Sequence, residues 1–296
     1  MLNVSKTVLF CDFFTKLEDW QSNFYQQNVN RNLNSAAINL NAVNNFECII
    51  IIVNNFKIRN METVEGITSM PRIGDKAPEF KAITTQGNIN FPEDYKGEWV
   101  ILFSHPADFT PVCTSEFITF ASLEDKFAKA GCKLVGLSID GLYSHIAWLR
   151  SIKEKIEYKG MKNIEVKFPL IEDITMEVAK KYGMIQPNEA STKAVRAVFF
   201  VDPKGIIRAI IYYPLSLGRN FDELYRVVVA LKTADEFGVS TPADWNPGDD
   251  VIIGTASSCG TAQDRMEGKE DMDCKEWYFC TRKLDKELLL SKVLKN

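Results

Sequence analysis

Histidine is nearly absent from this chain of 296 residues, which has only His105 and His145. So few histidines argue against a metal centre that relies on imidazole ligands. Long apolar runs are absent too: the longest, Cys48 to Val53, has the length of a strand and not the ~18–20 residues of a membrane span. Basic residues are not in excess, because the net charge is −4 and the pI about 5.5. A nucleic-acid-binding surface is therefore not expected.

A secretory signal is not expected either, since the N-terminus lacks a basic segment followed by an apolar segment with a small-residue cleavage site. The seven cysteines are odd in number and scattered, unlike the disulfide framework of a small secreted protein. They are typical of an intracellular protein with a few working thiols. We therefore expect a cytoplasmic protein. The cysteines are Cys11, Cys48, Cys113, Cys132, Cys259, Cys274 and Cys280.

Glycine and proline are missing from residues 1–60, which hold thirteen of the twenty asparagines in the chain. This leader could be a poorly ordered extension or a small added module. It could also be sequence upstream of a natural start at Met61 or Met70. We favour the last interpretation, because the composition changes sharply just before Met61.

Regular patterns begin at Pro71. Continuous apolar runs predict buried strands, at 99–106, 132–140 and near 168–171. Helical spacing of apolar residues predicts helices, at 114–131, 143–157, 174–183 and 220–238. Asn220 is expected to cap the last helix. A turn from Asp202 to Gly205 should join two strands within 195–214. Strands that alternate with helices indicate a three-layer α/β domain.

Two folded domains are expected after the leader. The α/β domain should span 71–238. A segment rich in proline, glycine and aspartate at 241–252 is typical of a linker. We therefore predict a smaller C-terminal domain at 239–296.

Cys113 is placed as a reactive thiol would be. The strand that ends at Pro106 should pass through a short loop into a helix that begins near Thr114, and a helix N-terminus favours the thiolate. The hydroxyl of Thr110 could hydrogen-bond the sulfur or an oxygen beside it. Arg196 could bring a positive charge from an apolar strand, or it could instead pair with a carboxylate at the surface. Such a thiolate is suited to attack a peroxide and form a sulfenic acid.

The segment HPADFTPVCTSE at 105–116 resembles the active-site signature of the peroxiredoxins, P-x-x-x-T-x-x-C. The resemblance extends from about Pro71 to about Lys283. In detail it is to the one-cysteine, peroxiredoxin-6-type subfamily, which includes archaeal-type thioredoxin peroxidases, and YYPLSLGRN at 212–220 supports it. It implies a thioredoxin-like α/β fold, a central mixed sheet flanked by helices, with a smaller C-terminal α+β extension that forms dimers.

The resemblance also implies site residues. Cys113 would be the peroxidatic cysteine, shielded by Pro106. Thr110 would orient the peroxide, and Arg196 would stabilise the thiolate and bind a peroxide oxygen.

Three further residues match supporting positions in the family. Arg219 corresponds to a second arginine near the site, and Glu116 to a carboxylate that orients the arginines. His105 corresponds to a histidine beside the cysteine, although a histidine at a strand end could equally be bonded to the backbone.

The cysteines of the tail allow three interpretations: a zinc site, packing, or redox chemistry. Redox chemistry is favoured, because archaeal-type members of the family carry a C-x5-C pair. The resemblance makes Cys280 the resolving cysteine of the partner subunit and Cys274 a thiol that passes the disulfide onward. Cys259 has no counterpart, and Cys132 is expected only to pack. Cys11 and Cys48 are given no role.

The sequence thus predicts a thiol peroxidase without a cofactor. Its expected partners are a peroxide, thioredoxin or a similar dithiol donor, and further copies of itself in a homodimer that assembles into a ring such as a decamer. Because a buried thiol must reach Cys280, the helix start near Thr114 should unwind. A redox sensor or chaperone-like ring could use the same thiol. A disulfide reductase is disfavoured, since Thr110 stands where C-x-x-C needs cysteine. No phospholipase serine motif G-x-S-x-G is present.

Overall fold

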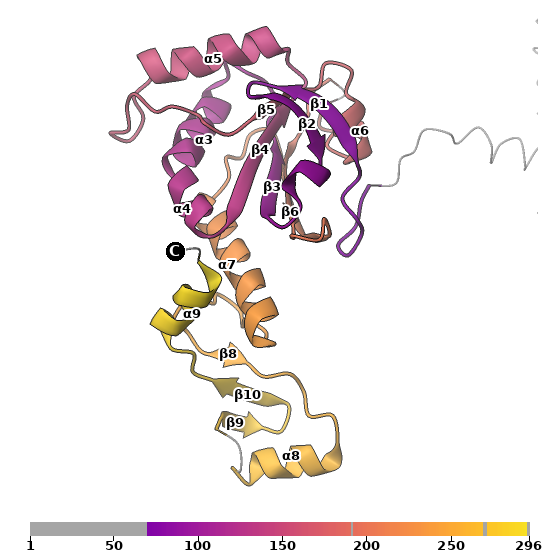
Figure 1. Ribbon diagram of the computed structural model, residues 1–296, viewed down its shortest axis with the longest axis vertical. Coiled ribbons are helices and arrows are strands. Elements are labelled where there is room, and N and C mark those ends of the chain that lie inside the picture. Colours follow the sequence, from indigo (N-terminus) through magenta and orange to yellow (C-terminus); the bar gives the residue numbers. More distant parts are fainter. Residues whose placement is uncertain (1–69, 191, 269–270, 295–296) are drawn as a thin grey trace, which may run out of the picture. The chain divides into compact units, whose positions relative to one another are not determined.

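The computed structural model describes residues 70–190, 192–268 and 271–294 (Figure 1). The expectation for residues 1–60 lies outside these ranges. The strands are β1 (Phe80–Thr84), β2 (Gly87–Phe91), β3 (Trp99–Ser104), β4 (Cys132–Ser138), β5 (Leu170–Glu172), β6 (Arg196–Val201), β7 (Ile207–Tyr213), β8 (Val251–Ile252), β9 (Asp273–Glu276) and β10 (Phe279–Arg282). The helices are η2 (Glu93–Tyr95), α3 (Pro111–Ser122), α4 (Glu124–Lys129), α5 (Leu142–Lys155), α6 (Glu177–Lys181), α7 (Phe221–Phe237), α8 (Cys259–Met266) and α9 (Lys286–Val293).

A mixed seven-stranded sheet runs in the order β2-β1-β5-β4-β3-β6-β7. β4 is parallel to both β3 and β5, whereas β3 and β6 are antiparallel. Every residue of β3 is buried. This explains the continuous apolar run at this place, since a strand covered on both faces cannot alternate between apolar and polar residues.

Helices cover both faces of the sheet. Successive side chains of β3 point to opposite faces, so Ile101 and Phe103 belong to one buried cluster and Val100 and Leu102 to another. The first cluster packs against α3, α4, α5 and α7, and the second against α6. The predicted three-layer arrangement follows from these two cores.

The single helix predicted over 114–131 is wrong in both its start and its length. α3 already begins at Pro111 and ends at Ser122, and α4 begins only after Leu123. Leu123 leaves the helical conformation with φ −101° and ψ 1°. The apolar spacing continues through this break, so periodicity alone gives no sign of it.

The hairpin and the long helix near the end of the α/β part are as predicted. The N–H of Gly205 donates to the carbonyl oxygen of Asp202 at 2.9 Å, which closes the turn between β6 and β7. The side chain of Asn220 accepts hydrogen bonds from the N–H groups of Asp222 and Glu223 and caps α7. Gly238 ends α7 with φ 62°, a left-handed conformation that glycine adopts without strain.

The C-terminal segment has a three-stranded sheet, β8-β10-β9, with α8 and α9. Its buried residues form a third cluster, to which Val229 and Ala230 of α7 contribute. Leu224 and Val228 of the same helix belong to the first cluster. α7 therefore takes part in two cores. A division into domains at 238/239 stays a prediction.

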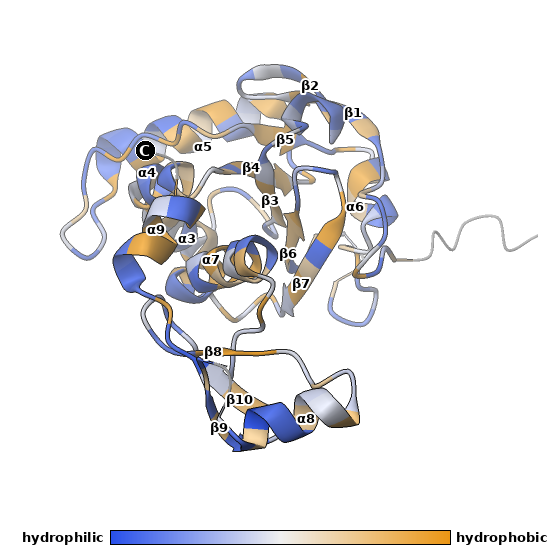
Figure 2. Ribbon diagram, turned by 60° about the horizontal axis from the view of Figure 1, so that its bottom comes forward, coloured by the Kyte–Doolittle hydropathy of each residue, from blue (hydrophilic) through white to orange (hydrophobic). Residues whose placement is uncertain are grey.

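The hydropathy of the elements follows their burial. Figure 2 shows hydrophobic residues gathered on the central strands, and hydrophilic residues along much of α8 and β9. None of the helices in the described ranges is both long and apolar enough to cross a membrane.

Candidate active site

The loop after β3 and the first turn of α3 hold Cys113. Thr110 has an extended backbone at the N-cap position, and Pro111 takes the first helical position, where a missing N–H costs nothing. The hydroxyl of Thr110 donates to the carbonyl oxygen of Ala107 at 2.9 Å, so this side chain does not cap the helix. Pro106 is buried in the loop. Cys113 is thus the third residue of α3.

This placement differs from the predicted helix start near Thr114. Apolar spacing marks the part of a helix that packs, but proline fixes where this helix begins. Cys113 therefore lies inside the first turn, where backbone N–H groups have no partner within the helix. The sulfur is fully buried. A helix N-terminus of this kind stabilises a negative charge.

Arg196 meets the sulfur of Cys113 from across the sheet. β6 pairs with β3 so that Val198 lies opposite Phe103, which brings Arg196 to the end of β3 where the loop starts. Its Nη1 donates to Sγ of Cys113 at 3.3 Å, and its Nε and Nη2 donate to the carbonyl oxygen of Leu215. Arg196 is only 2% exposed. The alternative of a surface ion pair is therefore wrong.

Glu116 holds two buried arginines together. Its Oε2 accepts from Nη1 of Arg196 at 2.7 Å and from Nη2 of Arg219 at 2.6 Å. Its Oε1 accepts from the backbone N–H and the Nε of Arg219. Burial alone would raise the pKa of Glu116, but the two arginines outweigh it and lower the pKa below its ordinary value of 4.5. Two cations and one anion leave a net charge of +1, which a thiolate at Cys113 would balance.

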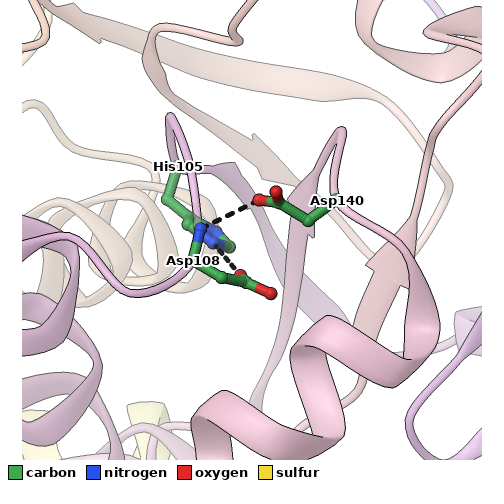
Figure 3. Close-up of side chains that lie close together, drawn as sticks. All are labelled: His105, Asp108 and Asp140. Carbon is green, nitrogen blue, oxygen red and sulfur yellow. Dashed lines mark hydrogen bonds and ion pairs between the residues drawn. The ribbon is translucent and has the colours of Figure 1, made fainter.

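His105 belongs to a second polar group, with Asp108 and the half-buried Asp140 (Figure 3). The buried His145 joins the same group through Asp108. Nε2 of His105 lies 2.9 Å from Oδ1 of Asp108, and Nδ1 of His145 lies 2.8 Å from Oδ2 of the same carboxylate. The N–H of Asp108 donates to Oδ2 of Asp140 at 2.8 Å. These distances are those of hydrogen bonds. The carboxylate oxygens that could bind a cation here already accept hydrogen bonds.

The protonation of His105 follows from its partner. Burial lowers the pKa of His105 below 6.5, although Asp108 opposes this effect. Burial would also raise the pKa of Asp108, but hydrogen bonds from His105 and His145 outweigh it, so this pKa is lowered. An ionised carboxylate only accepts, so the proton of a neutral His105 resides on Nε2. Its buried Nδ1 has no hydrogen-bond partner in the part of the chain that the structure describes.

Trp148 links α5 to the first turn of α3. Its Nε1 donates to the hydroxyl oxygen of Thr114 at 3.2 Å, and that hydroxyl donates to the carbonyl oxygen of Thr110. The indole ring also stacks on His105, with ring centroids 5.1 Å apart. The alternative of a His105 side chain bonded to backbone is therefore wrong, since this side chain contacts Asp108 and Trp148. The hydrogen bonds from Trp148 to Thr114 and from Thr114 to Thr110 therefore hold the first turn of α3, which carries Cys113.

The cysteines of the tail form a pair within one chain. A disulfide joins Cys274 of β9 to Cys280 of β10, and the two residues face each other in the register of the hairpin. Cys113 is a free thiol, and no disulfide between it and Cys280 is present in the described residues. Cys259 is exposed at the start of α8. Burial raises the pKa of Cys132 to about 12, as suits a thiol that only packs.

The predicted residues thus divide into two places. The first is the loop after β3 with its surroundings: hydrogen bonds join Cys113, Glu116, Arg196 and Arg219, while Pro106 and Thr110 lie in the loop and His105 bonds Asp108 of the same loop. The second is the hairpin of the tail cysteines. Asp108 and Trp148 were not predicted to belong to the site, and His145 was given no role. Both histidines of the chain share one carboxylate, and a short H-x-x-D spacing was the only local sign of it.

Known proteins resemble this chain over most of its described length. Residues 73–210 match the AhpC/TSA family, and residues 230–269 match the C-terminal domain of 1-Cys peroxiredoxin. A peroxiredoxin of Methanosarcina mazei is 60% identical over 216 residues, which are 72% of this chain and 98% of the relative. A peroxiredoxin of Aquifex aeolicus is 50% identical over 228 residues, 74% of this chain and 99% of the relative.

Solved structures show the same fold. A yeast mitochondrial 1-Cys peroxiredoxin has a TM-score of 0.63 at 42% identity, over 73% of this chain and all of the other. A cysteine-to-serine mutant of peroxiredoxin 6 of Arenicola marina has a TM-score of 0.63 at 33% identity, over 73% of this chain and 99% of the other. The predicted thioredoxin-like fold with a C-terminal extension is confirmed. The family implies a peroxide substrate, a thiol reductant and self-association. The chain belongs to the peroxiredoxins and is a peroxidase, an oxidoreductase of this family.

Proposed function

We propose that Cys113 reduces hydrogen peroxide and organic hydroperoxides, and that Cys280 of a second subunit resolves the product. The observation that carries this proposal is the 3.3 Å contact from Arg196 to the sulfur of Cys113, inside a buried cluster that has one positive charge too many. The family and the buried first turn of α3 support it.

The first step would occur at this sulfur. The thiolate of Cys113 attacks one peroxide oxygen, the O–O bond breaks, and the other oxygen leaves with the electron pair and takes up a proton. The product is a sulfenic acid. Arg196 would stabilise the charge that develops on the oxygens. The hydroxyl of Thr110 donates to Ala107, so its lone pairs remain able to accept from the peroxide O–H. Pro106 would shield the sulfur.

Resolution requires movement. The sulfur of Cys113 is fully buried, whereas two cysteines in a disulfide have Cα atoms within ~4.4–6.8 Å. The first turn of α3 must therefore unwind, which breaks the bond from Thr114 to Thr110 and the bond from Trp148 to Thr114. The thiolate of Cys280 then attacks the sulfenic sulfur and releases water. Cys274 attacks Cys280 in turn, frees Cys113, and leaves the disulfide that the hairpin holds.

Peroxide consumption tests the first step. The wild type should consume peroxide with thioredoxin, glutathione or dithiothreitol as donor, and Cys113→Ser should lose turnover, because it lacks the nucleophile. Cys259→Ser is the matched control and should keep full turnover, since this exposed thiol is outside the site. Turnover that survives in Cys113→Ser would disprove the assignment. A sensor or chaperone-like ring would instead react once without turnover.

A trapped intermediate tests the second step. One equivalent of peroxide should convert reduced Cys274→Ser into a covalent dimer on non-reducing gels, because the disulfide between Cys113 and Cys280 can no longer pass on. Cys280→Ser should give no such dimer and should over-oxidise at Cys113 to sulfinic acid. A dimer that forms without Cys280 would show that another thiol resolves.

We also propose an electron donor, an assembly and a cellular location. Thioredoxin or a similar dithiol protein would be the donor, and homodimers would assemble into a ring such as a decamer. A chain with free working thiols suits the cytoplasm.

A further inference from the structure

The disulfide of the β9–β10 hairpin is buried unequally. Cys280 is fully buried, and its Sγ lies 3.5 Å from the carbonyl oxygen of Glu276 and 4.0 Å from that of Trp277. Cys274 is half-buried, between the exposed residues Asp273 and Lys275. Cys274 is therefore the more accessible of the two cysteines to an incoming thiol in this conformation.

We propose that the reducing thiol attacks Cys274, and that Cys280 leaves as a thiolate held by Arg265. This inference rests on the proposed function, because it names the entry point of the donor in that cycle. In thiol–disulfide exchange a thiolate attacks one sulfur and the other departs with the bonding electrons. Access selects the attacked sulfur, and stabilisation of the departing thiolate speeds the reaction.

Arg265 provides a charge for the departing sulfur. It lies on α8, the residue is 8% exposed, and its Nε is buried. Its Nη1 donates to the carbonyl oxygen of Trp277 at 3.3 Å, the same oxygen that faces Sγ of Cys280. Among the described residues its Nε has no hydrogen-bond partner, and no carboxylate forms an ion pair with it.

A buried guanidinium with an unused N–H is costly unless an anion meets it. While the disulfide is intact, neither sulfur carries a charge. When the disulfide opens, a thiolate at Cys280 supplies the anion beside Arg265. Arg282, two residues beyond Cys280 on β10, also has a buried Nε without a partner. Arg265 and Arg282 therefore each have a buried Nε–H that could meet an anion in this part of the chain.

The complete reduction balances with a dithiol donor. The donor thiolate forms a disulfide with Cys274, the bond from Cys274 to Cys280 breaks, and Cys280 keeps the electron pair. The second donor thiol then displaces Cys274, and the donor leaves as its own disulfide. Two electrons and two protons reach the hairpin. Cys280 is thus free before Cys274.

Peptide mapping tests the point of attack. Trypsin cuts after Lys275 and Arg282, so Cys274 lies on peptide 270–275 and Cys280 on peptide 276–282. Cys113→Ser, which cannot turn over peroxide under the proposed function, is oxidised with diamide to form the hairpin disulfide. It then reacts briefly with glutathione and is quenched in denaturant with N-ethylmaleimide at mildly acidic pH, so that buried thiols are labelled too.

Glutathione should appear on Cys274 and maleimide on Cys280, in at least about tenfold excess over the reverse labelling, as the greater accessibility of Cys274 predicts. Glutathione on Cys280 in equal or larger amount would overturn the proposal. So would the failure of diamide to join the two cysteines. Because the measurement uses no peroxide, it separates this inference from the proposed function, which fails if the wild type shows no turnover that depends on Cys113.

The role of Arg265 has a separate readout. In reduced protein, the rate of maleimide labelling at Cys280 rises with pH as the thiolate forms. Arg265→Gln should move the midpoint upward by about one pH unit or more, since an adjacent opposite charge stabilises the anion by this order. Arg265→Lys should restore most of the shift. Lys283→Gln removes an exposed cation from the same segment and should leave the midpoint unchanged.

An unchanged midpoint in Arg265→Gln would disprove the role of the arginine. If Arg265→Gln disturbs the fold of the hairpin, the labelling pattern with glutathione, measured with Arg265 in place, still decides which sulfur is attacked.

Discussion

At the scale of single residues, Glu116 has the largest set of charged contacts in the candidate site. One carboxylate receives hydrogen bonds from two arginines that are themselves buried. Each guanidinium would be a costly buried charge without it. Glu116 therefore sets the position of the cation that meets Cys113, although it does not touch the sulfur itself.

We predict that Glu116→Gln lowers the free energy of unfolding at pH 7 by about 3 kcal/mol, the cost of leaving a buried charge unpaired. The loss should depend on pH, because the pKa of Glu116 in the folded protein lies below 4.5. A depressed carboxylate pKa gives stability that is complete above 4.5 and disappears as the pH falls through the folded value. Urea unfolding at several pH values measures the difference.

The matched control is Glu154→Gln, which removes an exposed ion pair with Arg150. It should cost no more than about 0.5 kcal/mol. An equal loss in both variants, or a loss in Glu116→Gln that persists unchanged far below pH 4.5, would contradict this account.

Local spacing made some residues of the site predictable. Pro106, Thr110 and Cys113 lie within one loop and one turn, so a short motif contains them. Asp108 and His145 are 37 positions apart, and only the packing of α5 against the loop joins them. A contact of this kind leaves no periodic signal in one sequence.

At the scale of elements, the residues that cap a helix decided whether its ends could be predicted. α7 has both a capping Asn220 and a terminal Gly238, and its predicted range agrees with the structure. α3 has no side-chain cap, and its start depends on Pro111. β1 and β2 were not predicted at all, because their short strands alternate poorly between apolar and polar residues.

We predict that Asn220→Ala lowers the free energy of unfolding by about 1 kcal/mol, the usual cost of losing an N-cap. The two N–H groups that Asn220 satisfies belong to Asp222 and Glu223. Asn220→Asp keeps an acceptor oxygen at the same place and should cost little. Thermal and urea unfolding of both variants measure this. A similar loss in both would show that the amide matters for another reason.

At the scale of the whole molecule, the relatives bear on the leader. The two archaeal and bacterial peroxiredoxins align over 72% and 74% of this chain while being covered almost completely themselves. The family match begins at residue 73. Residues 71–296, which include both predicted folded domains, are thus about as long as a whole relative.

We predict that deletion of residues 1–60 leaves the peroxidase rate and the melting temperature unchanged, because the family match begins only at residue 73. Peroxide consumption and calorimetry compare the full chain with the shortened one. A loss of several degrees would show that the leader packs on the domain, since about 1 kcal/mol shifts the melting temperature of a domain this size by a few degrees.

α7 contributes buried residues to two cores, so the stability of each core depends on the same helix. Leu224 and Val228 face the sheet, whereas Val229 and Ala230 face the C-terminal cluster. If α7 unfolds, both the sheet core and the C-terminal cluster lose packing contacts. The stabilities of the two parts are therefore not independent quantities but share one coupling free energy, in the way that neighbouring units of a repeat protein do. A substitution in the C-terminal cluster would then also change the free energy of local unfolding in the α/β part.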